Sequence, residues 1–533
     1  MSTTDSGRRD FLRATAGTVL ASALPAWASA ASIDASESPL ARVRGGQLRG
    51  YRDRGIAVFK GIPYGADTTH QRFLPPRMEL PWQGVRDALA YGPASPQPKA
   101  DEASSEDCLR LNVWTPGLRD GRKRPILFYI HGGAYNNGSG SSPLYDGANL
   151  CRRGDVVVMT VNHRLNAFGY LYLAPFGAPD LADAGNVGQL DLIQALQWVR
   201  AHAAEFGGDA GNVTVFGQSG GGAKIATLMA MPAARGLFHR AWTMSGQQVT
   251  ACGPRAAAQR AAMVLEALKL TPAQVDRLRT LPAAELIAAA QVRDPSRAED
   301  TALYLGPVLD SRSLPRHPFW PEAPAQSAGI PMVIGNTHDE TRAFLGHDAK
   351  NFALTWDELP AKLDRQQYVD LSPEVVIAEY RRLYPQYTPS DVFFAATTAG
   401  RSWRGAVEEL EARARQQAPT WAYQLDWASP LQPQLGAYHT LDIPLVFDNI
   451  DHPEARTGQG ADAKAMAARM SEALLAFARH GDPNHAGLPR WEPYGLARRQ
   501  TLLFDSTPRM ADDPRGGERR LYAQVPFIQR GTF

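Results

Sequence analysis

The segment 217–221 reads Gly-Gln-Ser-Gly-Gly, which matches the pattern Gly-x-Ser-x-Gly, and its flanks restrict what this chain can fold into. It directly follows the β-branched and aromatic run 212–216 and directly precedes the helix-forming run 222–230. A serine on a sharp strand-to-helix turn is the arrangement called a nucleophile elbow. The helix that begins there points its positive end at the place where an oxyanion would form. Ser219 is therefore the candidate nucleophile.

The glycines of this pentapeptide have a steric role in such a turn. Gly217 and Gly221 lie two residues to either side of Ser219, where a larger side chain would collide as strand and helix converge. The alternative is a glycine-rich surface turn, because a chain with 47 glycines in 533 residues gives roughly 0.2 chance matches to the pattern. The flanking strand and helix, and the motifs below, argue against that alternative.

Buried apolar runs alternate with helical patterns along the chain. The continuous apolar runs, each typical of a buried strand, are 125–130, 155–161, 239–244, 330–335 and 420–425. Residues 190–202 have apolar side chains at helical spacing, and the stretches 255–300 and 355–418 look like helical insertions without linkers around them. This alternation predicts an α/β fold with a central, mostly parallel sheet between helices. We expect one catalytic domain with a helical cap over residues 31–533.

The N-terminus has the features of an export signal. Arg8 and Arg9 precede a mildly apolar run over 14–26, and the Ala-x-Ala sites 26–28 and 28–30 follow. Residues 1–30 resemble a twin-arginine signal peptide, cleaved near residues 28–30. The expected partner is the Tat export machinery, and the expected location is the periplasm or the medium. A disordered basic tail and an uncleaved anchor are the alternatives.

Composition excludes several classes of protein. A net charge of +2 argues against a partner such as nucleic acid or a membrane surface. The sequence has no long apolar stretch that would insert stably into a membrane. Cys108, Cys151 and Cys252 are widely spaced and form no metal-ligand pattern. One disulfide in an oxidising compartment and three buried thiols are both open.

A serine hydroxyl needs a base, most often a histidine held by a carboxylate. In α/β-hydrolases these groups follow the order serine, acid, histidine. The histidines that could come after the acid are His347, His439, His452, His480 and His485. We select His439 because it lies in a loop after the strand 421–425 and before the apolar run 443–447. The other four lie in charged or turn-like stretches.

The acid is expected in the loop that follows the buried run 330–334. Asp339 and Glu340 are both available there, and chain order does not choose between them. An oxyanion hole needs backbone N–H groups on a loop without bulky side chains. Gly132 and Gly133 follow the strand 125–130, and their amides, with that of Gly220 after the nucleophile, would supply three donors.

These motifs together resemble those of the type-B carboxylesterases, the family that also contains the cholinesterases. The resemblance runs from about residue 40 to the C-terminus through the segments 59–65, 105–114, 130–135, 161–165, 206–209, 217–221, 244–246, 336–340, 438–439 and 443–447. It implies the α/β-hydrolase fold and a serine esterase that needs no metal or cofactor. It also implies glutamate as the acid, which selects Glu340 beside Ser219 and His439. Ser245 matches a position near the acid, so the resemblance implies a supporting hydrogen bond to Glu340.

The sequence departs from the family pattern at four places. Gln218 replaces the usual glutamate and Gly220 the usual alanine of the elbow. Ser95 occurs where the disulfide partner of Cys108 is expected, so that bridge should be absent. The segment between Trp82 and Cys108 has no tryptophan of the kind that binds quaternary ammonium in cholinesterases. A choline esterase is therefore not expected.

The sequence thus predicts a secreted carboxylesterase that hydrolyses small-molecule esters through an acyl-enzyme on Ser219. Two alternatives are open. One is a hydrolase of the same family dedicated to a single xenobiotic or toxin ester, a carbamate or an amide. The other is a non-catalytic binding protein of the same fold, which the presence of every expected catalytic residue disfavours.

Overall fold

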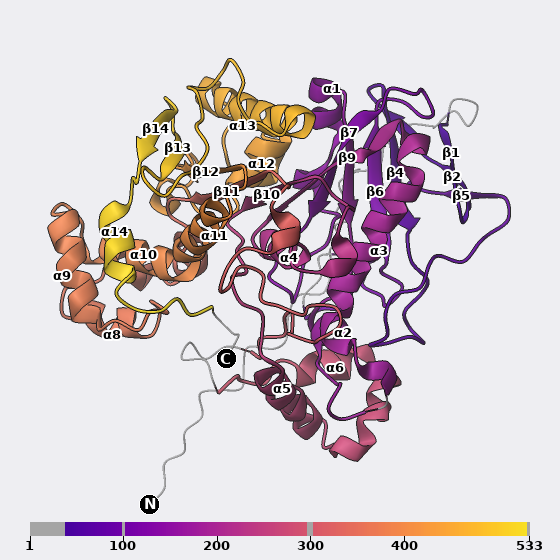
Figure 1. Ribbon diagram of the computed structural model, residues 1–533, viewed down its shortest axis with the longest axis horizontal. Helices are drawn as coiled ribbons and strands as arrows, with labels where there is room; N and C mark the ends of the chain where they lie inside the picture. Colours follow the sequence, from indigo (N-terminus) through magenta and orange to yellow (C-terminus); the bar gives the residue numbers. More distant parts are fainter. Residues whose placement is uncertain (1–37, 99–101, 178, 296–301, 530–533) are drawn as a thin grey trace, which may run out of the picture. The chain divides into compact units, whose positions relative to one another are not determined.

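A large sheet organises the chain (Figure 1). The computed structural model describes residues 38–98, 102–177, 179–295 and 302–529, so the expected signal over 1–30 lies outside the described residues. In the described part the sheet has eleven strands in the order β14-β13-β12-β11-β10-β9-β7-β8-β6-β4-β3. The strands are β3 (Tyr51–Asp53), β4 (Ile56–Pro63), β6 (Arg110–Thr115), β7 (Arg124–Ile130), β8 (Val157–Val161), β9 (Gly208–Gln218), β10 (Arg240–Met244), β11 (Met332–Thr337), β12 (Thr420–Leu425), β13 (Gln500–Phe504) and β14 (Arg509–Asp512).

The middle of this sheet is parallel and its margins are antiparallel. The strands β8, β7 and β9 to β13 pair in parallel, while β14, β6, β4 and β3 pair antiparallel to their neighbours. A small second sheet joins β1 (Leu40–Val43), β2 (Gly46–Arg49) and β5 (Val85–Asp87). The predicted mostly parallel sheet is confirmed, and every strand that the apolar runs indicated is present.

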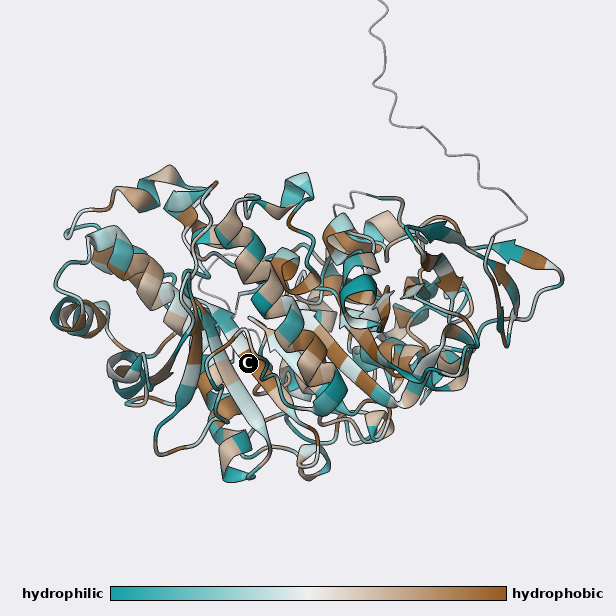
Figure 2. Ribbon diagram, turned by 90° about the horizontal axis from the view of Figure 1, so that it is seen from above, coloured by the Kyte–Doolittle hydropathy of each residue, from teal (hydrophilic) through white to brown (hydrophobic). Residues whose placement is uncertain are grey.

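Helices cover both faces of the sheet, as the uniformly apolar strands require. In β7, Phe128 and Ile130 pack with residues of α3 (Val187–His202) and α4 (Gly220–Leu228). The alternate residues Leu127 and Tyr129 pack on the other face with α1 (Ala148–Gly154), α12 (Asp442–Phe447) and α13 (Ala461–His480). Hydrophobic residues accordingly colour both the strands and the adjoining helices in Figure 2.

Helical insertions follow β10 and β11, in the stretches that the sequence predicted. The first contains α5 (Pro254–Ala267), the 3₁₀ segment Pro272–Arg279 and α6 (Ala283–Ala289). The second contains α7 (Arg342–Leu345), α8 (Leu359–Asp364), α9 (Pro373–Leu383), α10 (Pro389–Thr398), a π-helical turn (Ala399–Trp403) and α11 (Arg404–Arg415). The remaining α-helices of the described residues are α2 (Asn166–Tyr170) and α14 (Gly516–Tyr522). The first insertion shares an apolar cluster with α2, and α8, α9 and α10 of the second share another with α14.

The cysteines are three buried free thiols. Ser95 forms a hydrogen bond with Cys108, at the position where the family resemblance places a disulfide partner. Burial raises the pKa of the Cys108 thiol to about 12, so this thiol stays protonated. Of the two alternatives that the sequence left open, the structure has the buried thiols.

The turn from β9 into α4 is a close-packed junction at the edge of the sheet. Ser219 adopts φ 56° and ψ −126°, a conformation that residues with side chains rarely occupy. Its N–H donates to the carbonyl of Met244 at the end of β10, at 2.7 Å. A Cβ on Gly221 would collide with the carbonyl of Ile130, and one on Gly217 would come 2.7 Å from the same oxygen. The two glycines of the motif therefore let three strand ends meet.

We predict that Gly221→Ala destabilises the protein by about 1–3 kcal/mol, because the new methyl group must displace the backbone of β7. Gly329→Ala is the matched control, since Gly329 is exposed and a Cβ there meets no atom within 4 Å. Thermal unfolding of both variants measures the difference. Equal melting temperatures for the two variants would contradict this account of the elbow.

Candidate active site

One cavity of about 720 Å³ lies at the carboxyl ends of the parallel strands. Its walls contain all seven residues that the sequence singled out, namely Gly132, Gly133, Ser219, Gly220, Ser245, Glu340 and His439. Strand register explains this convergence. Ile130 pairs with Gly217, Met244 with Gln218, and Gly335 with Met244, so the loops after β7, β9, β10 and β11 begin at the same edge.

Glu340 and His439 form a buried pair in this cavity. Their side chains are only 1% and 7% exposed, and His439 Nδ1 makes a short hydrogen bond to Glu340 Oε2. The other carboxylate oxygen accepts from the backbone N–H of Thr337 at 2.9 Å and from Asn336 Nδ2 at 3.3 Å. These contacts fix the carboxylate, and the carboxylate in turn fixes the imidazole. A histidine held in this way can accept a proton at Nε2 and be stabilised when charged.

Asp339, the other acid that the sequence offered, has different contacts. It forms ion pairs with His338 at 3.2 Å and Arg342 at 3.3 Å and accepts from the N–H of Ala437 at 3.0 Å. Burial alone would raise the pKa of Asp339, but the hydrogen bond from His338 and the charges of His338 and Arg342 hold it below its usual value. Asp339 thus ties the loop after β11 to the segment that carries the histidine.

His439 lies in the turn just before α12, with its ring against Phe344 at a centroid distance of 4.7 Å. Its Nε2 accepts from the side-chain amide of Gln218 at 3.1 Å. Gln218 directly precedes Ser219, so the imidazole reaches the elbow through the residue beside the candidate nucleophile. The sequence identified Gln218 as a departure from the family pattern but predicted no contact with the histidine.

The glycine loop after β7 runs directly over the elbow. A Cβ on Gly132 would come 3.2 Å from the Cβ of Ser219. Gly133 and Ala134 adopt φ 84° and 50°, and this left-handed pair turns the loop toward α4. A Cβ on Gly220 would collide with the carbonyl of Ala134, which explains why glycine replaces the usual alanine at this position. The first N–H groups of a helix have no acceptor within it, so the start of α4 can offer Gly220 N–H to the cavity.

Ser245 requires a correction. Its side chain lines the cavity, but within the described residues its buried Oγ has no hydrogen-bond partner. The expected bond to Glu340 is not formed; Glu340 accepts from Thr337, Asn336 and His439 instead. The sequence placed Asn336 in the loop after the apolar run 330–334 without giving it a role, and the structure places it within β11. Its amide side chain, four residues before the acid, was the sequence signal that Asn336 could hold Glu340 by a hydrogen bond.

A second buried carboxyl group lies near the Glu340–His439 pair. Asp442, in the first turn of α12, accepts from the hydroxyl of Tyr423 at 3.0 Å. Burial, followed by the negative charge of Glu340, raises the pKa of Asp442 to about 7. Partial protonation at neutral pH thus avoids a second full negative charge beside the pair.

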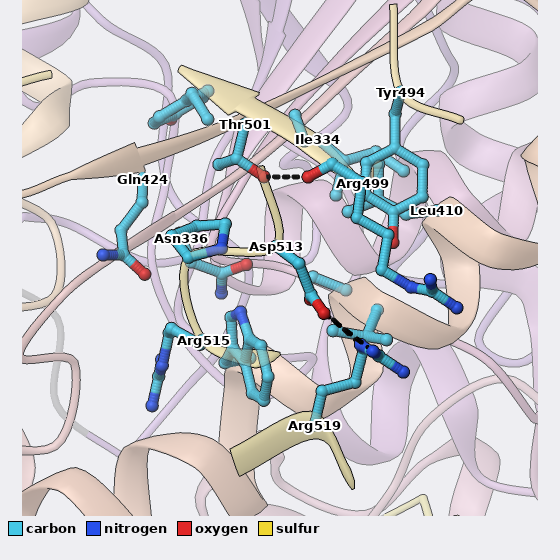
Figure 3. A pocket seen from close by; sticks show the side chains of 16 residues that line it. Ile334, Asn336, Leu410, Gln424, Tyr494, Arg499, Thr501, Asp513, Arg515 and Arg519 are labelled. Atoms are coloured by element: carbon cyan, nitrogen blue, oxygen red, sulfur yellow. Dashed lines mark hydrogen bonds and ion pairs between the residues drawn. The ribbon is translucent and has the colours of Figure 1, made fainter. Parts of the chain in front are cut away.

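A separate, much smaller cavity of about 40 Å³ lies between β11, β12 and α11 (Figure 3). Its basic side chains are each paired with a carboxylate: Arg519 with Asp513 at 2.7 Å, Arg499 with Glu411 at 3.1 Å, and Arg515 with Glu518 at 3.0 Å. A space of that size holds a water molecule rather than an ester. We assign this cavity a structural role.

Comparisons with known proteins identify the family of this chain. A family model described as "Carboxylesterase family" matches residues 35–521. Para-nitrobenzyl esterase of Bacillus subtilis is 36% identical over 488 residues, 89% of this chain and 96% of that protein. Phenmedipham hydrolase of Pseudarthrobacter oxydans is 32% identical over 482 residues, 86% and 93% of the two chains. The crystal structure of carboxylesterase Est55 of Geobacillus stearothermophilus matches with a TM-score of 0.81 at 38% identity, covering 91% of this chain and 99% of that one.

Proposed function

Because the chain belongs to the carboxylesterase family, a family of carboxylic ester hydrolases with the α/β-hydrolase fold, we propose that it cleaves small-molecule esters through an acyl-enzyme on Ser219. The observation that carries this proposal is the single cavity in which Ser219, Glu340, His439 and the two loop glycines meet. These residues come from loops more than 300 positions apart, and a binding protein has no need for that set of chemical groups.

In the proposed reaction His439 accepts the proton of Ser219 as the hydroxyl oxygen attacks the ester carbonyl. Glu340 orients the imidazole through Nδ1 and stabilises its charged form. The Nε2 atom exchanges its hydrogen bond from Gln218 for one from the neighbouring serine. His439 then donates the proton to the leaving alcohol, and a water molecule activated by the same imidazole releases the acid.

The negative charge of the tetrahedral intermediate needs preorganised donors. The amides of Gly132, Gly133 and Gly220 are the proposed donors, supported by the close approach of Gly132 to Ser219 and by the position of Gly220 at the start of α4. The residues named supply the nucleophile, base and oxyanion donors, so the proposed reaction needs no metal or cofactor.

The cavity lining favours uncharged esters with hydrogen-bonding groups. The lining contains the amide side chains of Asn136, Asn137 and Gln248 and the apolar side chains of Phe344 and Ile443. With Gln218 in place of a glutamate, the elbow presents no carboxylate to a cationic substrate. The second candidate function is a hydrolase dedicated to one ester, carbamate or amide. The similarity to phenmedipham hydrolase supports this candidate. A substrate panel with matched ester, carbamate and amide series separates the two.

We predict that Ser219→Ala lowers hydrolysis of p-nitrophenyl acetate and butyrate by at least about 10³-fold, because the acyl-enzyme cannot form. Labelling by a fluorophosphonate probe should be lost as well, since the probe reacts with an activated serine. The melting temperature should stay near the wild-type value. Turnover at the wild-type rate would refute the proposed nucleophile, and labelling of the alanine variant would indicate another one.

The two neighbouring carboxyl groups provide a matched pair of variants. We predict that Glu340→Gln lowers kcat by about 10²–10⁴-fold with little change in KM, because the imidazole loses its orienting carboxylate. Asp339→Asn makes the same chemical change one residue away and should keep kcat within a few-fold. Steady-state kinetics with thermal melts of both variants provide the test. A larger loss of kcat in folded Asp339→Asn than in Glu340→Gln would reverse the assignment.

We also propose that residues 1–30 direct twin-arginine export and that the mature chain, a single domain, begins near residues 29–31. Mass spectrometry of the protein secreted or released from the periplasm should give that N-terminus. Replacing Arg8 and Arg9 by lysine removes the paired arginines and should leave the precursor inside the cell. An exported protein that retains residues 1–30 would contradict cleavage, and export of the double-lysine variant would contradict the pathway. Within the described part of the chain, no helix combines the length and apolar character needed to cross a membrane.

A further inference from the structure

Lys224 is fully buried in α4, five residues after the proposed nucleophile. Lysine is almost never fully buried unless a partner compensates its charge. No carboxylate lies within ion-pair distance of Lys224 in the described residues. Instead Nζ donates to two backbone carbonyls of the glycine loop, that of Ala134 at 2.7 Å and that of His131 at 3.2 Å. The ammonium also lies 5.5 Å from the ring centre of Tyr135.

The position of these bonds in the loop has a stereochemical consequence. In a planar trans peptide unit the C=O and the following N–H point in opposite directions. The bond from Lys224 to the carbonyl of His131 therefore sets the direction of the Gly132 N–H, which points away from the lysine. In the next peptide unit, His131 Nδ1 lies 2.9 Å from the carbonyl of Gly132. A proton on that nitrogen makes the bond and sets the direction of the Gly133 N–H in the same way.

The charge state of His131 follows from the same neighbours. Burial, with the positive charge of Lys224 second, lowers the pKa of His131 to about 3. The ring is therefore neutral at pH 7, and the hydrogen bond to Gly132 O assigns its one proton to Nδ1. Within the described residues Nε2 has no partner.

We propose that Lys224 is a positioning residue that orients the oxyanion-binding amides: Gly132 directly, and Gly133 with the help of His131. The inference rests on the proposed function, because it concerns the same oxyanion. Through its bond to Ala134, Lys224 also holds the loop against Gly220, the third amide. When Lys224 is protonated, its positive charge also stabilises the oxyanion, because the interaction between the two charges is strong in this water-poor region.

A purely structural explanation is weaker on physical grounds. A methionine side chain would fill the same space as Lys224. Burying the amino group of Lys224 without a carboxylate partner lowers the stability of the folded protein. Burial lowers the pKa of Lys224 to about 7, which expresses that cost. If the side chain only filled space, an apolar residue would do so more favourably at this fully buried position.

The test is Lys224→Met, which keeps the length of the side chain and removes the donor and the charge. We expect kcat per active site to fall about 10–100-fold, somewhat less than for loss of a whole oxyanion donor, with KM within threefold. The inhibition constant of an alkyl trifluoromethyl ketone, which forms an oxyanion on the serine, should rise by the same factor as kcat/KM falls. The melting temperature should be unchanged or higher.

Lys60→Met is the matched control. Lys60 is another largely buried lysine, packed on Tyr91 at 4.1 Å, and burial lowers its pKa too, but it does not line the cavity. The Lys60→Met variant should retain the wild-type kcat and ketone inhibition constant. Active sites are counted by the end point of fluorophosphonate labelling, so that a misfolded fraction does not count as lost catalysis.

Three outcomes would overturn the proposal. One is Lys224→Met with kcat per active site within twofold of wild type. Another is a fall in kcat without a matching rise in the ketone inhibition constant. If the methionine variant does not fold, Lys224→Leu, which also removes the donor and the charge, is measured instead, and an unchanged ketone affinity there is the third. The proposed function fails separately, by full activity of Ser219→Ala.

Discussion

The structure of the site depends on one close approach, the meeting of β7, β9 and β10 around the backbone of Ser219. Holding a serine at positive φ costs of the order of 1–3 kcal/mol, and the surrounding contacts must supply it. The bond from Ser219 N–H to Met244 and the contact of Gly221 with β7 do so. Because the strands are parallel and in register, fixing this point also brings the glycine loop and the acid loop to the same edge.

The charges around this point are arranged for a reaction that creates an anion. Glu340 is paired with His439, and Gln218 is neutral where relatives of this type usually have a carboxylate. Lys224 adds a buried basic side chain behind the glycine loop, which is a cation when protonated. The elbow thus lacks the negative group of the family pattern, and a basic side chain lies behind the proposed oxyanion donors. This balance is unfavourable for cationic substrates and favourable for a negatively charged transition state.

The sequence predicted the sheet, the elbow and the positions of the site residues, because each depends on a local pattern. The strand 125–130 is apolar throughout and is buried on both faces, and the Gly-x-Ser-x-Gly turn needs only its neighbours to be recognised. The failures concern contacts between loops. Whether Ser245 or Asn336 holds Glu340, and whether Gln218 reaches His439, depends on rotamers and spacings across three strand ends. No periodicity encodes those distances.

The helical insertion after β11 is more than a cover, because it helps to place the acid. Asn336, which holds Glu340, is itself bound to Ser402 in the π-helical turn at 2.7 Å. Thr341, directly after Glu340, donates its hydroxyl to the carbonyl of Phe394 at 3.0 Å and its backbone N–H to Thr398 Oγ1 in α10 at 3.2 Å. A π-helical turn widens the helix locally and often occurs at functional sites. Here it turns Ser402 toward the acid loop, so a shift of α10 and α11 would move the carboxylate and, through it, the imidazole.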